Sequence, residues 1–223
     1  MSEKCDYFNI FCQVSRTFGT TLKREKILDL IVKSAIETMD AKAACLFFED
    51  DEAKSDVFVP IAQKGLSRSY LHAEPKEAKR AADEIMKKGY IAIHDATRDP
   101  RVKTHDIKKR EGIASILVVP VMVKERVKGV LTLYTAKPRT FSEEEIQFLT
   151  ALAEQGGLAI ERARLIMQIT QNIRIFKSIA EGLNESLDIK VIMERLSVDM
   201  ARALKVKAVS VRLIDKDKGV LEL

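Results

Sequence analysis

The segment from Asp95 to Arg101, with the sequence DATRDPR, is the densest group of side chains here that could bind a charged ligand. Asp99 suits the N-cap of a short helix, with Pro100 at the first helical position. In that arrangement Arg98 and Arg101 could face an anion near the helix N-terminus. The same residues also suit a loop with a purely structural role, which is the favoured interpretation, and anion binding stays open as the alternative.

Three histidines, His72, His94 and His105, could each offer an imidazole, which is a suitable axial ligand for haem iron. His94 stands at the end of a short strand pattern, and the other two have polar neighbours. Such positions are typical of surface or capping histidines. Haem binding therefore stays open as the less favoured alternative, and no metal site is predicted.

The three cysteines, Cys5, Cys12 and Cys45, cannot all pair with one another. They show neither the CxxC nor the Cys/His spacing that marks a redox motif or a structural metal site. We therefore expect reduced and mostly buried thiols. A redox or metal role for any of them is the minority interpretation.

The length of 223 residues fits one domain of ordinary size and a fragment of another. No apolar run approaches the roughly 18 residues that span a membrane, and the N-terminus lacks the apolar core of a signal peptide. A cytoplasmic protein without a membrane segment is predicted.

The net charge of +5 arises in one stretch of the chain. Between Lys76 and Arg110 there are 11 lysines and arginines against 6 aspartates and glutamates. A basic segment can attract anions or acidic partners, although it can equally be a solvated helix face. Aromatic residues do not alternate with the basic ones, and helix-turn-helix and zinc-finger patterns are absent, so nucleic-acid binding is not expected.

The periodicity of apolar residues predicts an alternation of helices and strands. Spacings of three and four predict helices at 4–20 and 22–39, and Thr21 could cap the second. Within the strand predicted at 115–123, Pro120 indicates a sheet edge or a bulge. Short apolar runs predict strands at 43–49, 57–62, 90–93, 115–123 and 127–135, with a turn at 49–52 and a helix at 76–88 between them.

The clearest helix start is the capping box formed by Ser142 and Glu145. No proline follows, so one helix could run from Ser142 to about Leu183. Gly156 and Gly157 each cost roughly 1 kcal/mol in a helix relative to alanine. Their presence predicts close packing of this helix against a sheet.

Residues 10–51 share one apolar rhythm with the segment 165 positions later, for example Ile10 with Ile175 and Ile27 with Ile192. Similarity at a fixed offset marks a repeated module. The second copy stops at Leu223 after one helix pattern and one hairpin pattern. One complete module and the start of a second are therefore expected.

A heptad-like apolar seam leads into each copy and needs a partner surface. This spacing predicts a homodimer held by a parallel coiled-coil-like contact, with packing inside one chain as the alternative. The candidate seam residues are Phe8, Phe11 and Phe18 in the N-terminal helix and Ile166, Ile169, Ile173, Phe176 and Leu183 in the long helix.

Three segments together resemble the GAF domain, a ligand-binding regulatory module of sensor kinases, cyclic-nucleotide phosphodiesterases and phytochromes. They are the helix and strand at 22–48, the run IAIHDATRDPRV at 91–102, and the hairpin with the capped helix at 115–161. The resemblance implies an α+β, PAS/profilin-like fold with an antiparallel sheet of five or six strands. Helices would cover one face, a ligand pocket would lie on the other, and a long C-terminal helix would lead out of the domain.

The repeat and the resemblance divide the chain into four expected parts. They are an N-terminal signalling helix at 1–20, a GAF-like sensor domain at 21–165, a helical linker at 166–185, and an incomplete second GAF-like domain at 186–223.

The ligand chemistries of this family depend on particular residues. The cyclic-nucleotide signature Asn-Lys-x-Phe-Asp-Glu is absent. Covalent bilin attachment needs a cysteine in the pocket loops, yet all cysteines precede residue 46, so none is expected. The methionine sulfoxide reductase branch needs redox cysteines around the pocket, and only Cys45 lies on a pocket-bearing strand. The identity of any cofactor or ligand therefore stays unknown.

The resemblance places several side chains near the pocket, as candidates for binding a small molecule or an anion. Which face of each strand points inward does not follow from the sequence. The candidates are Phe47, Tyr90, His94, Arg98, Arg101, His105, Ser115, Thr132 and Tyr134.

The expected function is regulatory, because the chain carries no catalytic signature. We expect a ligand-sensing module of a signal-transduction protein, a sensor kinase or a related one, that relays its state through the long dimeric helix. A non-sensing dimerisation scaffold is the main alternative. A small redox enzyme of the methionine sulfoxide reductase type is a weaker one.

Overall fold

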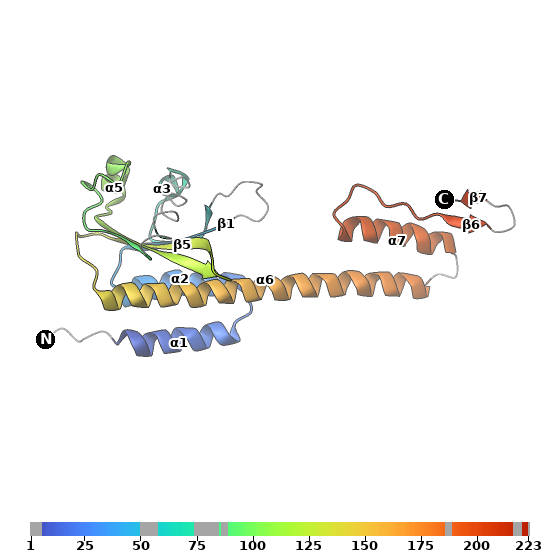
Figure 1. The fold of residues 1–223 in the computed structure, drawn as a ribbon, viewed down its shortest axis with the longest axis horizontal. Coiled ribbons are helices and arrows are strands. Elements are labelled where there is room, and N and C mark those ends of the chain that lie inside the picture. Colours follow the sequence, from blue (N-terminus) through green and yellow to red (C-terminus); the bar gives the residue numbers. More distant parts are fainter. Residues whose placement is uncertain are drawn as a thin grey trace. The chain divides into compact units, whose positions relative to one another are not determined.

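The computed structural model describes residues 6–49, 58–73, 85, 89–185, 189–215 and 220–222, which fall into two compact units, Met1–Ala163 and Arg164–Leu223. The first unit contains the helices α1 (Tyr7–Thr20), α2 (Arg24–Thr38), α3 (Arg68–Ala73) and α5 (His105–Glu111). Its strands are β1 (Ala43–Glu49), β2 (Phe58–Lys64), β3 (Ile91–Ile93), β4 (Ser115–Val123) and β5 (Arg126–Thr135). Helix α6 (Glu143–Glu185) begins in this unit and continues into the second, which also contains α7 (Ile189–Ala203) and a hairpin of β6 (Leu213–Asp215) and β7 (Val220–Glu222) (Figure 1).

Most predicted elements are confirmed, and the bounds of β1 and β4 are those expected. The predicted helix at 76–88 and turn at 49–52 lie outside the described residues, apart from Ile85 and Glu49. The cap assigned to Thr21 was wrong. Lys23 occupies the N-cap position of α2 without a side-chain hydrogen bond, and Thr21 instead ends α1 by donating its backbone N–H to Thr17 O.

The five strands of the first unit form one antiparallel sheet in the order β2-β1-β5-β4-β3, which confirms the expected architecture. Pro120 pairs with Val130 of β5 and lies beyond Val118, the last residue of β4 that pairs with β3. The proline therefore removes no hydrogen bond to β3. A register shift follows between Val121 and Met122.

The sheet separates two hydrophobic layers, because successive strand residues point to opposite faces. The first layer joins strand residues such as Leu131 to Phe18 of α1, Ile31 of α2 and Leu152 of α6. The second layer joins the other strand face to α3 and α5, as through Tyr70. Helices α2 and α6 thus lie on the opposite side of the sheet from α3 and α5 (Figure 1). The expected coverage of one face by α1, α2 and α6 is confirmed.

The capping box at the start of α6 is confirmed. Glu145 N donates to Ser142 Oγ over 3.2 Å, and Ser142 N donates to Glu145 Oε2 over 2.8 Å. Glu145 also pairs with Arg139, whose Nη1 donates to Met39 O at the end of α2. The first turn of α6 is therefore fixed to α2 as well as to its own backbone.

The two adjacent glycines of α6 stand where the helix meets its neighbours. A Cβ at Gly156 would lie 2.5 Å from Ile31 Cδ1 of α2, and one at Gly157 would lie 2.6 Å from Val121 Cγ1 of β4. The predicted close approach of this helix to the sheet is thus found at Gly157.

Replacing Gly157 by alanine is expected to destabilise the domain, although alanine is the better helix former. The new methyl group would overlap a stiff β-branched side chain and approach Met122 O at 3.3 Å. Overpacking of about 1–3 kcal/mol exceeds the roughly 1 kcal/mol gained in helix propensity. Urea unfolding of the variant should show a lower midpoint, and an unchanged or higher midpoint would contradict the packing described.

Candidate functional site

The second layer holds three of the side chains proposed to line a pocket. Phe47, Thr132 and Tyr134 are buried on the face of the sheet opposite α1, α2 and α6. Thr132 lies opposite Cys45 and Val118, both of which belong to the second layer. The structure thus brings these three candidates to one face.

A lysine that the sequence analysis did not single out is buried against this layer. Lys108 of α5 is only 2% exposed, and its Nζ donates to Tyr70 Oη of α3 over 2.5 Å. The same Nζ lies 4.7 Å from the centroid of the Tyr70 ring. The Tyr70 ring in turn meets Tyr134 edge to face, with centroids 5.7 Å apart and an interplanar angle of 86°. We call Lys108, Tyr70 and Tyr134 the lysine–tyrosine cluster.

The chemistry of this cluster follows from the burial of its amine. Desolvation lowers the pKa of Lys108 from 10.5 to about 7, because an apolar layer disfavours the charged form. The side chain can therefore gain or lose its proton near neutral pH. A nearby anion would favour the ammonium form, so anion binding and protonation would support each other.

The charged side chains of the loop from Asp95 to Arg101 form most of their hydrogen bonds within the loop itself. Asp95 Oδ1 accepts hydrogen bonds from the Thr97 hydroxyl at 2.6 Å and from Thr97 N at 2.9 Å. Arg101 donates to both oxygens of Asp99, at 3.0 and 2.7 Å, and to Ala92 O at 3.2 Å. These hydrogen bonds hold the pKa of each aspartate below its usual range. They support the structural interpretation of the loop.

The remaining candidates lie at different depths. Tyr90 is 40% exposed, Arg98 points largely into solvent beside Asp95, and His105 Nε2 lies 2.8 Å from Asp99 O. Ser115 is fully buried, and its hydroxyl donates to His94 O over 2.6 Å and accepts from Arg139 N over 2.8 Å. Through these contacts Ser115 links the loop that follows β3 to the loop that precedes α6. They do not bring it to the lysine–tyrosine cluster.

The sequence of the first unit matches a known domain family. Residues 21–161 match the sequence profile of the GAF domain, and this stretch includes all five strands of the sheet. The chain belongs to the GAF domain family. The fold implied by the sequence resemblance is therefore confirmed.

Individual relatives of this GAF domain come from several kinds of protein. A 60-residue segment, 26% of the chain, is 37% identical to the circadian input-output histidine kinase CikA of Thermosynechococcus vestitus, and it spans only 8% of that protein. The GAF domain of a phosphoenolpyruvate-protein phosphotransferase from Coxiella burnetii superposes with a TM-score of 0.60 at 22% identity, over 74% of this chain and 98% of that one. The free methionine-R-sulfoxide reductase of Neisseria meningitidis superposes with a TM-score of 0.55 at 18% identity, over 72% of this chain and 91% of that one. The two structural likenesses establish the fold alone.

Cys45 is the cysteine of this GAF domain that faces the lysine–tyrosine side of the sheet. It is fully buried, and burial raises the pKa of its thiol far above the usual range. Because the thiolate is the reactive form, the environment suppresses nucleophilic or redox chemistry at this sulfur. Cys12 is free and partly exposed on α1.

No group of three or more His, Cys, Asp or Glu side chains is placed to hold a metal ion within the described part of the chain. In the same residues, no helix has both the length and the apolar character needed to cross a membrane.

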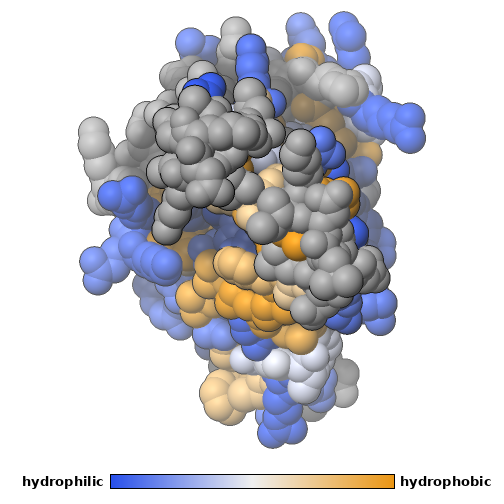
Figure 2. All heavy atoms as spheres, turned by 90° about the vertical axis from the view of Figure 1, so that its right-hand side faces the viewer, coloured by the Kyte–Doolittle hydropathy of each residue, from blue (hydrophilic) through white to orange (hydrophobic). Residues whose placement is uncertain are grey.

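The proposed seam residues divide between core and surface. Phe18 is buried in the first layer, whereas Phe8 is 74% exposed and Phe11 is half-buried. In α6, the seam residues Ile166, Ile169, Ile173 and Phe176 are all exposed, and the side chain of Leu183 lies outside the described set. Hydrophobic side chains also reach the surface elsewhere on the second unit, since Val191 and Val198 of α7 are each at least half exposed. Figure 2 shows hydrophobic side chains at the surface on the face that it presents.

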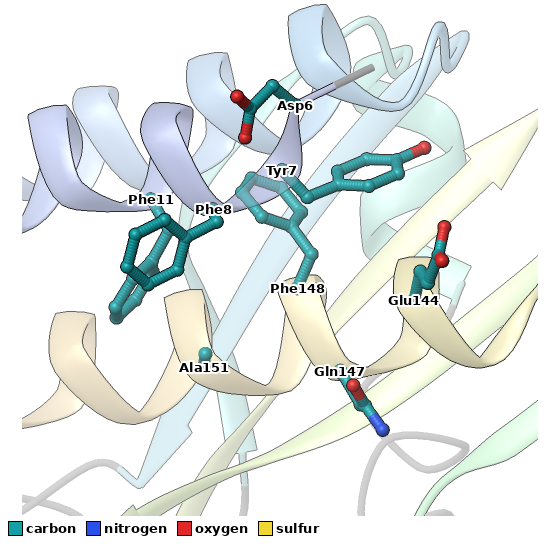
Figure 3. A pocket seen from close by; sticks show the side chains of 8 residues that line it. All are labelled: Asp6, Tyr7, Phe8, Phe11, Glu144, Gln147, Phe148 and Ala151. Atoms are coloured by element: carbon teal, nitrogen blue, oxygen red, sulfur yellow. The ribbon is translucent and has the colours of Figure 1, made fainter. Parts of the chain in front are cut away.

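A groove of about 560 Å³ runs between α1 and α6 in the first unit (Figure 3). Phe148 points from α6 toward Tyr7 of α1, with ring centroids 5.3 Å apart. At the far end of α1, Arg162 of α6 donates to the carbonyls of Phe18, Gly19 and Thr21. Helices α1 and α6 are thus joined by contacts near both ends of α1. The lining residues of the groove are Asp6, Tyr7, Phe8, Phe11, Glu144, Gln147, Phe148 and Ala151.

Proposed function

We propose that this GAF domain is a regulatory sensor that binds a small anionic molecule beside Lys108, on the second face of the sheet. The observation that carries the proposal is the burial of the Lys108 amine against Tyr70, at a pKa near 7. Such a perturbed lysine in a polar cluster within an apolar layer is a candidate functional group. A carboxylate or phosphate would stabilise its ammonium form, and Tyr70 with its neighbour Tyr134 would offer neutral hydrogen-bonding groups.

The sheet supplies a route from this site to α6. In β4, Ile116 and Val118 belong to the second layer, while Leu117, Val119 and Val121 belong to the first. Val121 packs against Gly157 of α6. Because glycine has no side chain that could change its rotamer, a displacement of β4 would act directly on the backbone of α6. We propose that a ligand which repositions β4 thereby shifts α6. Such a relay requires two states of α6 with different affinities for the ligand.

The proposed setting is a cytoplasmic signal-transduction protein, a sensor kinase or a related one. The segment shared with a histidine kinase supports this assignment. We also propose that residues 186–223 begin a second GAF-like unit, joined to the first by a helical linker at 166–185. The order of α7, β6 and β7 repeats that of α2, β1 and β2, which supports the proposal.

Thermal unfolding of the full chain in the presence of small molecules tests the sensing function. The panel contains inorganic phosphate, acetate, 2-oxoglutarate, AMP and haem, at pH 6.5. A ligand present at 100 times its Kd stabilises the native state by about 2.7 kcal/mol, which corresponds to a rise in Tm of several degrees. At least one anion should produce such a rise. A panel in which no compound raises Tm would favour a non-sensing dimerisation scaffold.

A further inference from the structure

Four aromatic side chains line the groove between α1 and α6. Phe148 of α6 is buried and packs against Tyr7 of α1. Phe8 leaves most of its surface in solvent and Phe11 is half-buried, so a molecule that enters the groove can reach both rings. Across from them, Ala151 of α6 carries only a methyl group, which leaves room between the two helices (Figure 3). The groove therefore offers open aromatic surface to a ligand.

The charged side chains of this lining are both acidic. Asp6 stands at the N-cap of α1 and Glu144 in the first turn of α6, and no described residue of the lining is basic. The hydrogen bonds that Asp6 accepts from Asn9 come from neutral N–H groups, so they do not cancel the charge of the carboxylate. The N-terminal dipoles of the two helices add only about half a positive charge each. Two full negative charges outweigh them, and the groove is negative.

We infer that this groove binds a small organic cation, an ammonium group carried on an apolar alkyl or aryl body. The faces of aromatic rings are negative and attract cations, and the two carboxylates add to this attraction. The groove volume of about 560 Å³ lies within the usual range of sites for small molecules. The carboxylates would repel an anion, and a neutral apolar molecule would gain nothing from them. The inference is independent of the anion site proposed at Lys108, which lies on the opposite side of the sheet.

An NMR titration of the ¹⁵N-labelled full chain tests the ligand class with three molecules of similar size. At neutral pH 2-phenylethylamine is a cation, 2-phenylethanol is neutral and phenylacetate is an anion. The amine should produce saturable shifts of the backbone amides of Phe8, Phe11 and Ala151, with a Kd about tenfold lower than that of the alcohol. Phenylacetate should produce no saturable shift of these amides.

Removal of charge at constant size tests the carboxylates. Glu144→Gln and Asp6→Asn should each raise the Kd of the amine about threefold and leave that of the alcohol unchanged. Asparagine suits an N-cap as well as aspartate does, so the start of α1 is preserved. Glu154→Gln makes the same change at an exposed position of α6 outside the lining, and it should leave both Kd values as in the parent.

Removal of one ring tests the aromatic surface. Phe8→Ala should weaken binding of the amine about threefold or more, because it deletes an open ring face without disturbing the core. Phe176→Ala removes a similarly exposed ring outside the groove and should bind the amine as the parent does.

Three results would overturn the inference. Equal Kd values for the amine and the alcohol would show an apolar surface that does not select a cation. Tighter binding of phenylacetate would show that the carboxylates do not set the charge preference. Failure of the amine to produce saturable shifts in the groove, as expected if a second copy of the chain covers it, would show that the groove is no site for a small molecule. None of these results depends on Lys108, so they are distinct from a failure of the anion panel.

Discussion

Replacing Lys108 by methionine should stabilise the ligand-free protein and abolish its response to anions. Methionine fills a similar volume but carries no group whose charged form is disfavoured by burial. Replacing a buried charge by a well-packed apolar residue can stabilise a protein by about 1–4 kcal/mol. Loss of the bond to Tyr70 offsets part of this gain, so we expect a rise in Tm of about 3–10 °C.

The pH dependence of unfolding separates this explanation from a simple packing effect. The pKa of Lys108 is about 7 in the folded protein and near 10.5 in the unfolded chain, so the unfolded state binds more protons between these values. Lys108 therefore makes stability rise with pH from about 7 to 10.5, and its full destabilising effect is present below pH 7. Lys108→Met should remove this contribution. Lys109→Met, which alters an exposed neighbour on α5, should leave both the pH profile and the Tm close to those of the parent.

Replacing Arg162 by alanine should release the C-terminal end of α1 from α6. The guanidinium donates to Gly19 O at 3.1 Å, to Thr21 O at 3.0 Å, and to Phe18 O. These carbonyls belong to the last turn of a helix, where no further backbone N–H is available within the helix. Hydrogen bonds from a charged donor contribute about 1.5–3 kcal/mol each, and shared donors are not additive. We expect a loss of about 2–4 kcal/mol.

Hydrogen exchange of the backbone amides of α1 measures the loss of stability in this helix directly. Arg162→Ala should speed exchange in α1 far more than in β4 or β5, because the sheet keeps its own hydrogen bonds. Arg16→Ala removes the same charge from an exposed position on α1 and serves as the matched control. Arg162→Lys should restore part of the protection, since it keeps the charge but not the planar fork. Equal protection of α1 in Arg162→Ala and in the parent would show that the contact is dispensable.

The secondary structure of the first unit followed largely from local patterns. The capping box at Ser142 set the start of α6, and short, nearly continuous apolar runs set the bounds of β1 and β4. Thr21 shows where such reasoning stops. A threonine between two helices can cap the second helix or end the first. Thr21 ends the first, and there its carbonyl accepts a hydrogen bond from Arg162. Arg162 lies 141 positions away in the sequence, so no local pattern reveals this contact.

The candidate site was less accessible from the sequence because it depends on contacts between distant elements. Lys108, Lys109 and Arg110 are adjacent basic residues, and no local signal marks Lys108 as the buried one. Its partner Tyr70 lies 38 residues earlier, in a short helix that was not predicted. Conversely, the dense charges of the DATRDPR segment suited both a ligand site and a structural loop, and the structure shows those charges bonded mainly within the loop.

The most direct test of the proposed sensor is the titration of the Lys108 amine itself. NMR of ¹³C,¹⁵N-lysine-labelled protein, with the Lys108 signal assigned from its absence in Lys108→Met, gives its pKa with and without the anion that raises Tm most in the panel. The ligand-free protein should titrate near pH 7, and the anion should move the pKa of Lys108 upward because it stabilises the ammonium form. A pKa near the ordinary 10.5 in the free protein, or one that the anion leaves unchanged, would contradict a binding site at Lys108.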